Sequence, residues 1–499
     1  MSHDCQSLTK LPALTLVLIV TMLALARPPA QAAPTADPFD PTQLSYGLYW
    51  FGLNGTNQKF APGETNPYFD PAKPTLIFAH GWQPLISNEL PDFDFDGTDT
   101  AAGWLDAGWN VGIFVWNQFS DETTGVTGAW FGDGPPPQGV LDAEAKIWSA
   151  NGPKGMRWRD WSKNPLLPPD YGYSTPPAGT PSAGELFYQT YIAALEGYTG
   201  TIRITGHSLG NQMAVRLTQL VDEGIAAGEV AEDLRPTRVA LLDPYWSPDA
   251  RADIPDGDAA GRKTGDVVRE YIAELTASGV LFEWYWSSTW TTPPQGDAND
   301  PLKPLIFYAE MDPAFETDDL DKHLAAQHLY FWSYAFDGPV PCTGDACLGM
   351  TRVLSKMSDE QLAAVMDADC YWIQDGGQST KTPQDDTYHS VCVSECVPLT
   401  EATINGPVGE TGTLYINFQY TFEAVTTPTT ATTPITYTWT PTPTSGQGAG
   451  SAVYTWATSG TQTITLTAEN CGGPVIAPER EIVIEDVPSR IYLPLILRN

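Results

Sequence analysis

Residues 201–221 read TIRITGHSLGNQMAVRLTQLV, and this stretch decides the fold. The run TIRIT is typical of a buried strand, and residues 212–221 carry apolar side chains at helical spacing. Between these segments, Gly206 and Gly210 bracket Ser208 in a Gly-x-Ser-x-Gly pattern. A strand, a serine between glycines and a helix predict a sharp turn that exposes a nucleophilic hydroxyl at the sheet edge. The helix N-terminus adds a positive field there.

Five other short apolar runs lie on both sides of this stretch: residues 75–79, 111–116, 238–242, 280–285 and 305–308. They are continuous rather than alternating, which predicts parallel strands buried on both faces. Helical patterns separate them, so we expect an α/β architecture with a doubly wound, mostly parallel sheet. Residues 117–182 are rich in Gly, Pro and Trp and show no clear periodicity. We predict there a long insertion that packs over the sheet as a functional lid.

The composition changes after about residue 391, to Thr, Val and Pro. Period-two alternation recurs in segments separated by turn residues: 411–422, 435–439, 452–456, 462–468 and 481–484. This predicts an all-β sandwich over residues 391–486. The strings ITYTW and VYTWATSGTQTITLTAENCGG resemble PKD-like and immunoglobulin-like modules, which implies a module that binds a cell surface or a polysaccharide. The apolar tail, residues 487–499, fits either a last strand or a sorting signal.

The first 32 residues have the features of a signal peptide. An apolar run over residues 11–26 follows a short polar stretch, and Ala30-Gln31-Ala32 fits a cleavage site. A transmembrane anchor is the other interpretation, but the run is short for a span. We therefore expect a secreted or cell-surface protein with a signal peptide at 1–32 and no transmembrane span in the mature chain. Its first folded domain is expected over residues 33–390.

The charge argues against nucleic acid as a partner, because 60 Asp and Glu against 25 Lys and Arg give a formal net charge of -35. Six cysteines follow the signal peptide: Cys342, Cys347, Cys370, Cys392, Cys396 and Cys471. In an exported chain an even number predicts disulfides. A zinc site with His389 beside Cys392 is the rival interpretation. No cysteine lies between residues 33 and 341, so the chemistry of that part does not use a thiol.

A nucleophilic serine needs a base, and the base needs an acid that orients it. In hydrolases that carry the serine on such a strand–turn–helix, the chain order is serine, acid, histidine. Asp243 directly follows the run 238–242 and is the predicted acid, with a turn-capping aspartate as the other interpretation. His323 follows an acidic run that suits a helix start, and we favour it as the base. His328, the alternative base, lies about 140° further round the helix, so both cannot face Ser208.

An acyl-transfer site also needs two N–H groups that stabilise an oxyanion. The residue after the nucleophile, Leu209, supplies one of them. The run 75–79 ends at His80-Gly81-Trp82, where the backbone can fold back towards the serine. Trp82 N–H is therefore the second predicted donor, and His80 is expected to brace the loop.

Four segments together resemble one group of enzymes: PTLIFAHGW (74–82), ITGHSLG (204–210), ALLDP (240–244) and KHLAAQHLYFWS (322–333). They are similar to the pancreatic-lipase-like group of the α/β-hydrolase superfamily. There the corresponding segments supply the oxyanion loop, the nucleophile, the acid and the base, and the spacing of the last segment favours His323. The interval from His80 to Ser208 is longer than in that group. The group's lid cysteines and lipid-binding sandwich are absent, so lipid substrates are implied only loosely.

The acidic stretch Asp92-Phe93-Asp94-Phe95-Asp96-Gly97 resembles the start of a calcium loop, which needs several hard oxygen ligands around a sharp turn. The Glu expected at the twelfth position is missing, since Gly103 stands there. A solvated acidic loop is the competing interpretation. Apart from this calcium site at Asp92, Asp94 and Asp96, no cofactor is expected.

These features predict a secreted serine hydrolase that cleaves carboxylic esters, of lipids or small molecules, through a Ser-Asp-His triad and an acyl-enzyme. A peptidase or a polyester depolymerase with the same triad is the alternative among enzymes, since a fold does not determine its substrate. A catalytically silent adhesion or binding protein is the alternative outside enzymes.

Overall fold

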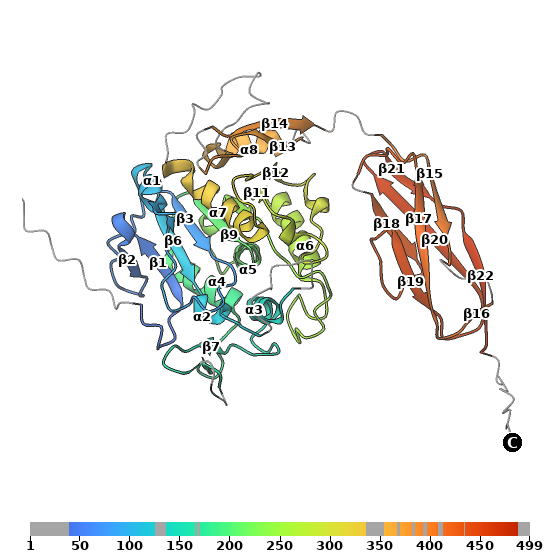
Figure 1. Ribbon diagram of the computed structural model, residues 1–499, viewed down its shortest axis with the longest axis horizontal. Helices are drawn as coiled ribbons and strands as arrows, with labels where there is room; N and C mark the ends of the chain where they lie inside the picture. Colours follow the sequence, from blue (N-terminus) through green and yellow to red (C-terminus); the bar gives the residue numbers. More distant parts are fainter. Residues whose placement is uncertain are drawn as a thin grey trace, which may run out of the picture. The chain divides into compact units, whose positions relative to one another are not determined.

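The computed structural model describes residues 39–124, 136–164, 167, 170–335, 354–366, 370–381, 385–392, 397–407, 413–433 and 435–487. They form an α/β region and a separate β-sheet region (Figure 1). The predicted signal peptide, and the predicted tail apart from Val487, lie outside these ranges. None of the described helices is long and apolar enough to cross a membrane.

The α/β region is built on a ten-stranded sheet in the order β14-β13-β12-β11-β10-β9-β3-β6-β1-β2. Its strands are β1 (Gly47–Phe51), β2 (Asn57–Lys59), β3 (Thr75–Ala79), β6 (Asn110–Val115), β9 (Ile202–His207), β10 (Arg238–Leu242), β11 (Leu281–Trp286), β12 (Phe307–Glu310), β13 (Cys370–Gly376) and β14 (Thr387–Cys392). In this spatial order, the neighbouring strands between β6 and β13 pair parallel. β1 and β2 at one edge and β14 at the other pair antiparallel. The predicted α/β architecture with a mostly parallel sheet is confirmed.

Helices cover both faces of the sheet because its strands are apolar on both sides. In β3, Ile77 and Ala79 belong to one buried cluster and Leu76 and Phe78 to the other. The first cluster includes residues of α3 (Gln138–Trp148), α4 (Ala183–Ala194), α5 (Gly210–Ala226) and α6 (Thr264–Ala277). The second includes residues of α1 (Thr100–Asp106), α7 (Asp319–Ala335) and α8 (Asp359–Met366). Two apolar layers therefore sandwich the sheet, which explains the continuous apolar runs in the sequence.

The segment 117–182 is more regular than its composition suggested. It contains α2 (Asn117–Ser120), α3 and the short strand pair β7 (Trp158–Arg159) and β8 (Tyr173–Ser174). The expectation of no periodicity is wrong for α3, where Val140, Ala143 and Ile147 all pack into the core. This helix is therefore a layer of the core rather than a loop laid over the sheet.

The β-sheet region contains two sheets around one apolar cluster. One sheet has the order β15-β17-β19, and the other has the order β16-β22-β20-β18 with β21 paired to β20. Their strands are β15 (Glu401–Asn405), β16 (Leu414–Tyr415), β17 (Gln419–Thr427), β18 (Thr436–Thr440), β19 (Ser451–Thr455), β20 (Gly460–Asn470), β21 (Gly473–Ile476) and β22 (Arg480–Glu485). Phe422 and Trp439, one from each sheet, are buried in the shared cluster. This arrangement has the two sheets and buried interior that the alternating segments predicted.

The cysteines are described only in part. Cys471 is disulfide-bonded. The backbone register places Cys370 opposite Cys392 across β13 and β14. The remaining cysteines of the predicted set, Cys342, Cys347 and Cys396, lie outside the described residues, so the disulfides other than that of Cys471 stay a prediction.

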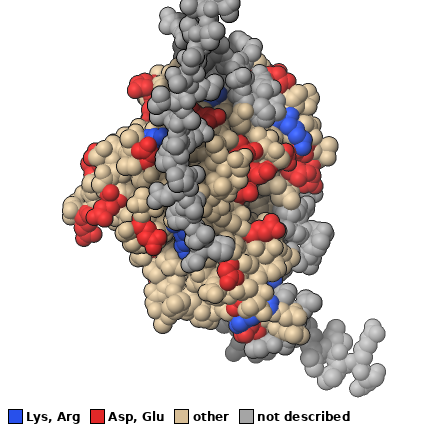
Figure 2. All heavy atoms as spheres, turned by 90° about the vertical axis from the view of Figure 1, so that its left-hand side faces the viewer, with Lys and Arg blue, Asp and Glu red and all other residues tan. Residues whose placement is uncertain are grey.

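Acidic side chains dominate the charge of the visible surface. Figure 2 shows Asp and Glu scattered over the described part of one face, with few Lys and Arg among them. The described part of this face shows no continuous basic stripe of the kind that binds a phosphate backbone, in keeping with the formal charge of -35 of the whole chain.

Candidate active site

Ser208 lies on the turn between β9 and α5, with φ of 55° in the left-handed region. Its N–H donates to the carbonyl of Leu242 (3.2 Å), which attaches the turn to β10. A Cβ on Gly206 would come within 2.5 Å of the Gly210 carbonyl oxygen, and a Cβ on Gly210 would overlap the carbonyl of Ala79. The two glycines that bracket the serine are therefore required by the close approach of turn, helix and strand β3.

Asp243 and His323 are joined by a hydrogen bond. The Nδ1–H of His323 donates to Oδ2 of Asp243 at 2.6 Å, and both side chains are buried. The other carboxylate oxygen accepts the N–H of Ser287 (3.1 Å) and the hydroxyl of Thr291 (3.2 Å). These donors hold the carboxylate, and the carboxylate in turn holds the imidazole. The Nε2 atom of His323 has no hydrogen-bond partner among the described residues.

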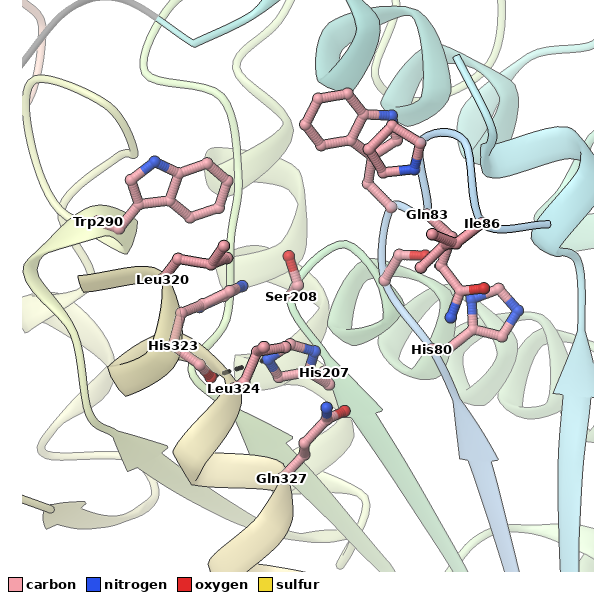
Figure 3. Close-up of a pocket in the computed structure, with 13 residues that line it drawn as sticks. His80, Gln83, Ile86, His207, Ser208, Trp290, Leu320, His323, Leu324 and Gln327 are labelled. Atoms are coloured by element: carbon pink, nitrogen blue, oxygen red, sulfur yellow. Dashed lines mark hydrogen bonds between the residues drawn. The ribbon is translucent and has the colours of Figure 1, made fainter. Parts of the chain in front are cut away.

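Ser208 and His323 line one cavity of about 340 Å³. In Figure 3 the His323 ring points towards Ser208 from the first turns of α7. No hydrogen bond joins these two described side chains, and the serine hydroxyl projects into the cavity. Such contacts are often long in ligand-free enzymes and shorten when substrate binds.

His80 braces the loop that follows β3. Its Nε2 accepts the N–H of Trp116 (3.2 Å), so Nδ1 carries the proton and donates to the Gly81 carbonyl (2.9 Å). Burial lowers the pKa of His80 to about 4, so the ring is neutral at pH 7. A Cβ on Gly81 would lie 2.7 Å from Cβ of Ser208. The loop that carries Trp82 therefore packs directly against the serine.

The structure separates the two candidate bases. His323 contacts Asp243, whereas His328 packs between Phe95 (ring centroids 5.0 Å apart) and Trp332 (5.5 Å) and does not line the cavity. The helical geometry made it impossible for both histidines to face the serine, and His323 is the one that does.

His207 is a residue of the site that the sequence analysis did not single out. Its Nε2–H donates to the backbone carbonyl of His323 (2.9 Å), and the two rings lie 4.5 Å apart. Burial, and secondly the nearby His323, lower the pKa of His207 well below its usual range. The residue stands inside GHSLG, but nothing in that motif indicates a partner so far along the chain.

Most of the remaining cavity wall is apolar. The apolar lining residues are Trp82, Pro84, Ile86, Trp290, Leu320 and Leu324. Trp290 is buried, with its ring 5.0 Å from that of His323, and Ile86 is 57% exposed. No Asp, Glu, Lys or Arg is among the described residues of the lining. The cavity therefore suits an uncharged, apolar group next to the serine.

The acidic stretch at 92–97 forms a hairpin. The strands β4 (Asp94–Phe95) and β5 (Thr98–Asp99) are joined by Asp96 and Gly97, both with positive φ, as in the tight turns that favour Asp-Gly. The Asp94 N–H donates to Asp92 (3.0 Å), and Asp96 pairs with Lys381 (3.2 Å). Among the described residues, which include this hairpin, no three His, Cys, Asp or Glu side chains gather to hold a metal ion. The side chain of His389 lies outside them, so the zinc site beside Cys392 is not tested. Calcium binding at Asp92, Asp94 and Asp96 stays a prediction without a preformed ligand set.

No protein-family model matches the chain, and no curated protein matches it. Among solved structures, the PKD domain of the human VPS10 domain-containing receptor SorCS2 is similar at 15% identity, over 20% of this chain and 85% of that one, with a TM-score of 0.15. A probable hydrolytic enzyme from Pseudomonas aeruginosa PAO1 is similar at 15% identity, over 42% of this chain, with a TM-score of 0.17. That match spans 46% of the bacterial enzyme. At such scores the likenesses carry no argument, so the function has to be argued from the residues of the site.

Proposed function

We propose that the protein is a serine hydrolase that cleaves carboxylic esters through an acyl-enzyme. The observation that carries this proposal is the hydrogen bond from His323 Nδ1 to Asp243 at 2.6 Å, made beside a serine on a left-handed turn. It leaves His323 Nε2 without a partner among the described residues, at the wall of the cavity that Ser208 lines. This arrangement supports Ser208 as nucleophile, His323 as base and Asp243 as orienting acid in acyl transfer.

In the proposed reaction the hydroxyl oxygen of Ser208 attacks the acyl carbonyl carbon while Nε2 of His323 takes the hydroxyl proton. Asp243 stabilises the resulting imidazolium through the bond at Nδ1. The N–H groups of Trp82 and Leu209 are the proposed donors to the tetrahedral oxyanion. His323 then gives its proton to the departing alcohol, and water activated by the same histidine releases the acid from Ser208.

The cavity supports an uncharged, compact acyl group as the substrate's acid part. Its apolar walls favour a hydrocarbon chain, and its volume of about 340 Å³ lies near the lower end of the usual range for ligand pockets. We therefore propose esters of short or medium-length apolar acids rather than charged acyl donors.

The reaction is tested with p-nitrophenyl esters of graded acyl length and with the variant Ser208→Ala. We expect hydrolysis by the parent and its loss in the variant, with Ser208 labelled by a fluorophosphonate in the parent. Ser333→Ala is the matched control, because Ser333 is a buried serine of α7 that does not line the cavity. Equal rates in the parent and Ser208→Ala would rule out this proposal. Peptide cleavage without ester cleavage would favour a peptidase, and activity on neither would favour a binding protein.

The proposed setting is outside the cell or on its surface, after removal of residues 1–32. The support is the apolar run over residues 11–26 and the small residues that follow it. N-terminal sequencing of the protein from the culture medium is expected to begin at Ala33. A product found only inside the cell with Met1 retained would contradict export. The proposed cell-surface or polysaccharide binding of residues 391–486 is tested with insoluble polysaccharides and whole cells.

A further inference from the structure

The loop after His80 is attached at several points to the segment that follows β6. The indole N–H of Trp82 donates to the carbonyl of Glu122 (2.9 Å). The side chain of Asn117 donates to the carbonyl of Glu89 (2.9 Å). Between these two bonds, one buried carboxylate holds the middle of the loop. The loop that is proposed to supply an oxyanion donor therefore depends on residues 117–122 for its shape.

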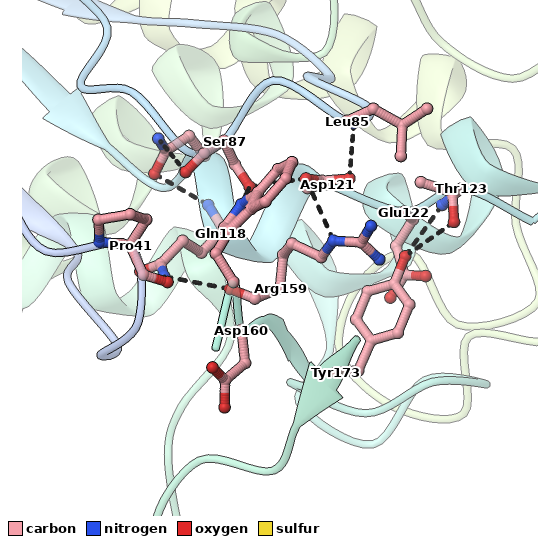
Figure 4. A network of polar contacts seen from close by, with 12 residues as sticks. Pro41, Leu85, Ser87, Gln118, Asp121, Glu122, Thr123, Arg159, Asp160 and Tyr173 are labelled. Atoms are coloured by element: carbon pink, nitrogen blue, oxygen red, sulfur yellow. Dashed lines mark hydrogen bonds and ion pairs between the residues drawn. The ribbon is translucent and has the colours of Figure 1, made fainter. Parts of the chain in front are cut away.

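That carboxylate belongs to Asp121, and both of its oxygens accept hydrogen bonds from this loop. Oδ1 accepts the N–H of Leu85 (2.9 Å), and Oδ2 accepts the hydroxyl of Ser87 (2.6 Å). Arg159 lies 3.9 Å from Oδ2, and Asp121 itself is fully buried. Figure 4 shows Asp121 between Leu85 and Arg159, with an interaction to each. We propose that Asp121 is a positioning residue that sets the oxyanion loop for the ester hydrolysis proposed above, on which this role rests.

Leu85 shows why the loop needs this support. Its φ of 66° is in the left-handed region, which leucine avoids for steric reasons. Its side chain is 48% exposed, so packing does little to compensate the strain. The N–H of this residue donates to the buried carboxyl group of Asp121, an acceptor that Asp121 provides in either protonation state, although burial raises the pKa of this group. Without Asp121 the backbone at Leu85 is expected to relax to negative φ.

The segment that carries Asp121 is itself held in place by buried ion pairs. Glu122, the next residue, is fully buried and accepts bonds from Lys146 Nζ (2.7 Å) and Arg157 Nε (2.8 Å). Trp161 adds a bond from its indole N–H to the Ser87 hydroxyl (3.0 Å). Residues of the segment 117–182 therefore hold the loop from one side, and Gly81 packs on Ser208 from the other. A small shift at Leu85 would change the position of the Trp82 N–H relative to the serine, and misplacement by about 1 Å can cost on the order of 100-fold in rate.

The test compares Asp121→Ala, Asp121→Asn and the control Asp160→Asn. Asp160 is a buried carboxylate next to Arg159 in the chain, and among the described residues its side chain accepts hydrogen bonds from Ser162 and Ser174 rather than from the loop after His80. The readouts are kcat and KM on p-nitrophenyl butyrate and the affinity for butaneboronic acid, whose tetrahedral adduct places an oxygen in the oxyanion site. We expect Asp121→Ala to lower kcat and boronate affinity by the same factor, about 10- to 100-fold, with KM changed less than about 2-fold. Asp121→Asn should retain most of the kcat and most of the boronate affinity, because an amide oxygen can still accept the Leu85 N–H.

Parental kcat and boronate affinity in Asp121→Ala would overturn the positioning role, as would an equal loss in Asp160→Asn. If the alanine variant does not fold, Ser87→Ala removes one donor to the same carboxylate. It is expected to lower kcat and boronate affinity together by about 2- to 5-fold at unchanged KM, and parental values there would overturn the role. A parent that neither hydrolyses esters nor binds the boronate would instead refute the proposed function, and the role of Asp121 with it.

Discussion

His207 Nε2–H donates to the backbone carbonyl of His323 at 2.9 Å. His207, which directly precedes Ser208, therefore holds the backbone of His323, whose ring faces Ser208. The two rings lie 4.5 Å apart, and burial keeps the pKa of His207 well below its usual range. A neutral ring suits the proposed acyl transfer, because a second positive charge would oppose the imidazolium that is proposed to form on His323. The nucleophile turn and the first turns of α7 are thus coupled by one bond.

We expect His207→Ala to lower kcat by about 10-fold, because the backbone of His323 loses its support next to the serine. In His207→Gln the amide nitrogen can occupy the place of Nε2 and donate to the same carbonyl, so most of the activity should remain. The measurement is kcat and KM on p-nitrophenyl butyrate, with circular dichroism as the check on folding. Equal kcat in the alanine variant and the parent would show that the bond does not position the base.

His323→Ala is expected to lower kcat by about 10⁴-fold or more, as loss of the base does in serine hydrolases that act through a triad. His328→Ala should keep the parental kcat within about 2-fold, because its ring packs on Phe95 and Trp332 outside the cavity. The pair of variants is compared on one ester at saturating concentration. If His328→Ala lowered kcat far more than His323→Ala did, the base would be His328.

Local signals in the sequence predicted six of the parallel strands but not β13, and they also marked Ser208, Asp243 and His323, whose catalytic roles stay predictions. The predicted strands are short, mostly apolar runs, and Asp243, the proposed acid, directly follows one of them. Helix α3 was missed because buried charges interrupt its apolar face: Glu144 pairs with Arg251, and Lys146 with Glu122. A segment with charged residues is interpreted as solvent-exposed unless the partners of those residues, which lie far along the chain, are known.

The same limit applies to the interactions that brace the site. The role of Asp121 depends on Leu85 and Ser87, and that of His207 on the backbone of His323. Neither pairing leaves a spacing pattern in the sequence. In contrast, the Asp96-Gly97 turn had a local signal for a hairpin, which the acidic composition of the stretch concealed.

Leu320 is half-buried and forms part of the cavity wall at the start of α7, so we expect it to limit the length of the acyl chain in the proposed reaction. We expect Leu320→Ala to raise the ratio of kcat/KM for octanoate over butyrate by about 10-fold, and Leu320→Trp to lower it, because pockets discriminate chain length by the space they leave. Leu305→Ala is the control, as Leu305 is exposed and does not line the cavity. An unchanged ratio in both Leu320 variants would mean that the acyl chain lies elsewhere.

Asp386, next to β14, makes stability depend on pH. It is 2% exposed and accepts a hydrogen bond from Gln374 Nε2 (3.0 Å), while its neighbour Asp385 is also acidic. Burial, followed by Asp385, raises the pKa of Asp386 from 3.8 to about 7. Between these pH values the folded state binds more protons than the unfolded state at this group. The free energy of unfolding therefore falls as pH rises from about 4 to about 7 and stays lower above it.

Asp386→Asn removes this dependence, because the amide does not ionise and its oxygen can still accept the Gln374 bond. The variant is expected to exceed the parent in stability at pH 8, by up to about 4 kcal/mol, and to match it near pH 4, where the parent carboxyl is protonated in the folded state. Urea unfolding followed by tryptophan fluorescence at pH 4, 6 and 8 measures the difference. Asp385→Asn, at the exposed neighbour, is expected to weaken the pH dependence without abolishing it, because its charge is the smaller cause of the raised pKa of Asp386. A variant that gains nothing between pH 4 and pH 8 would show that Asp386 is ionised in the folded protein without penalty.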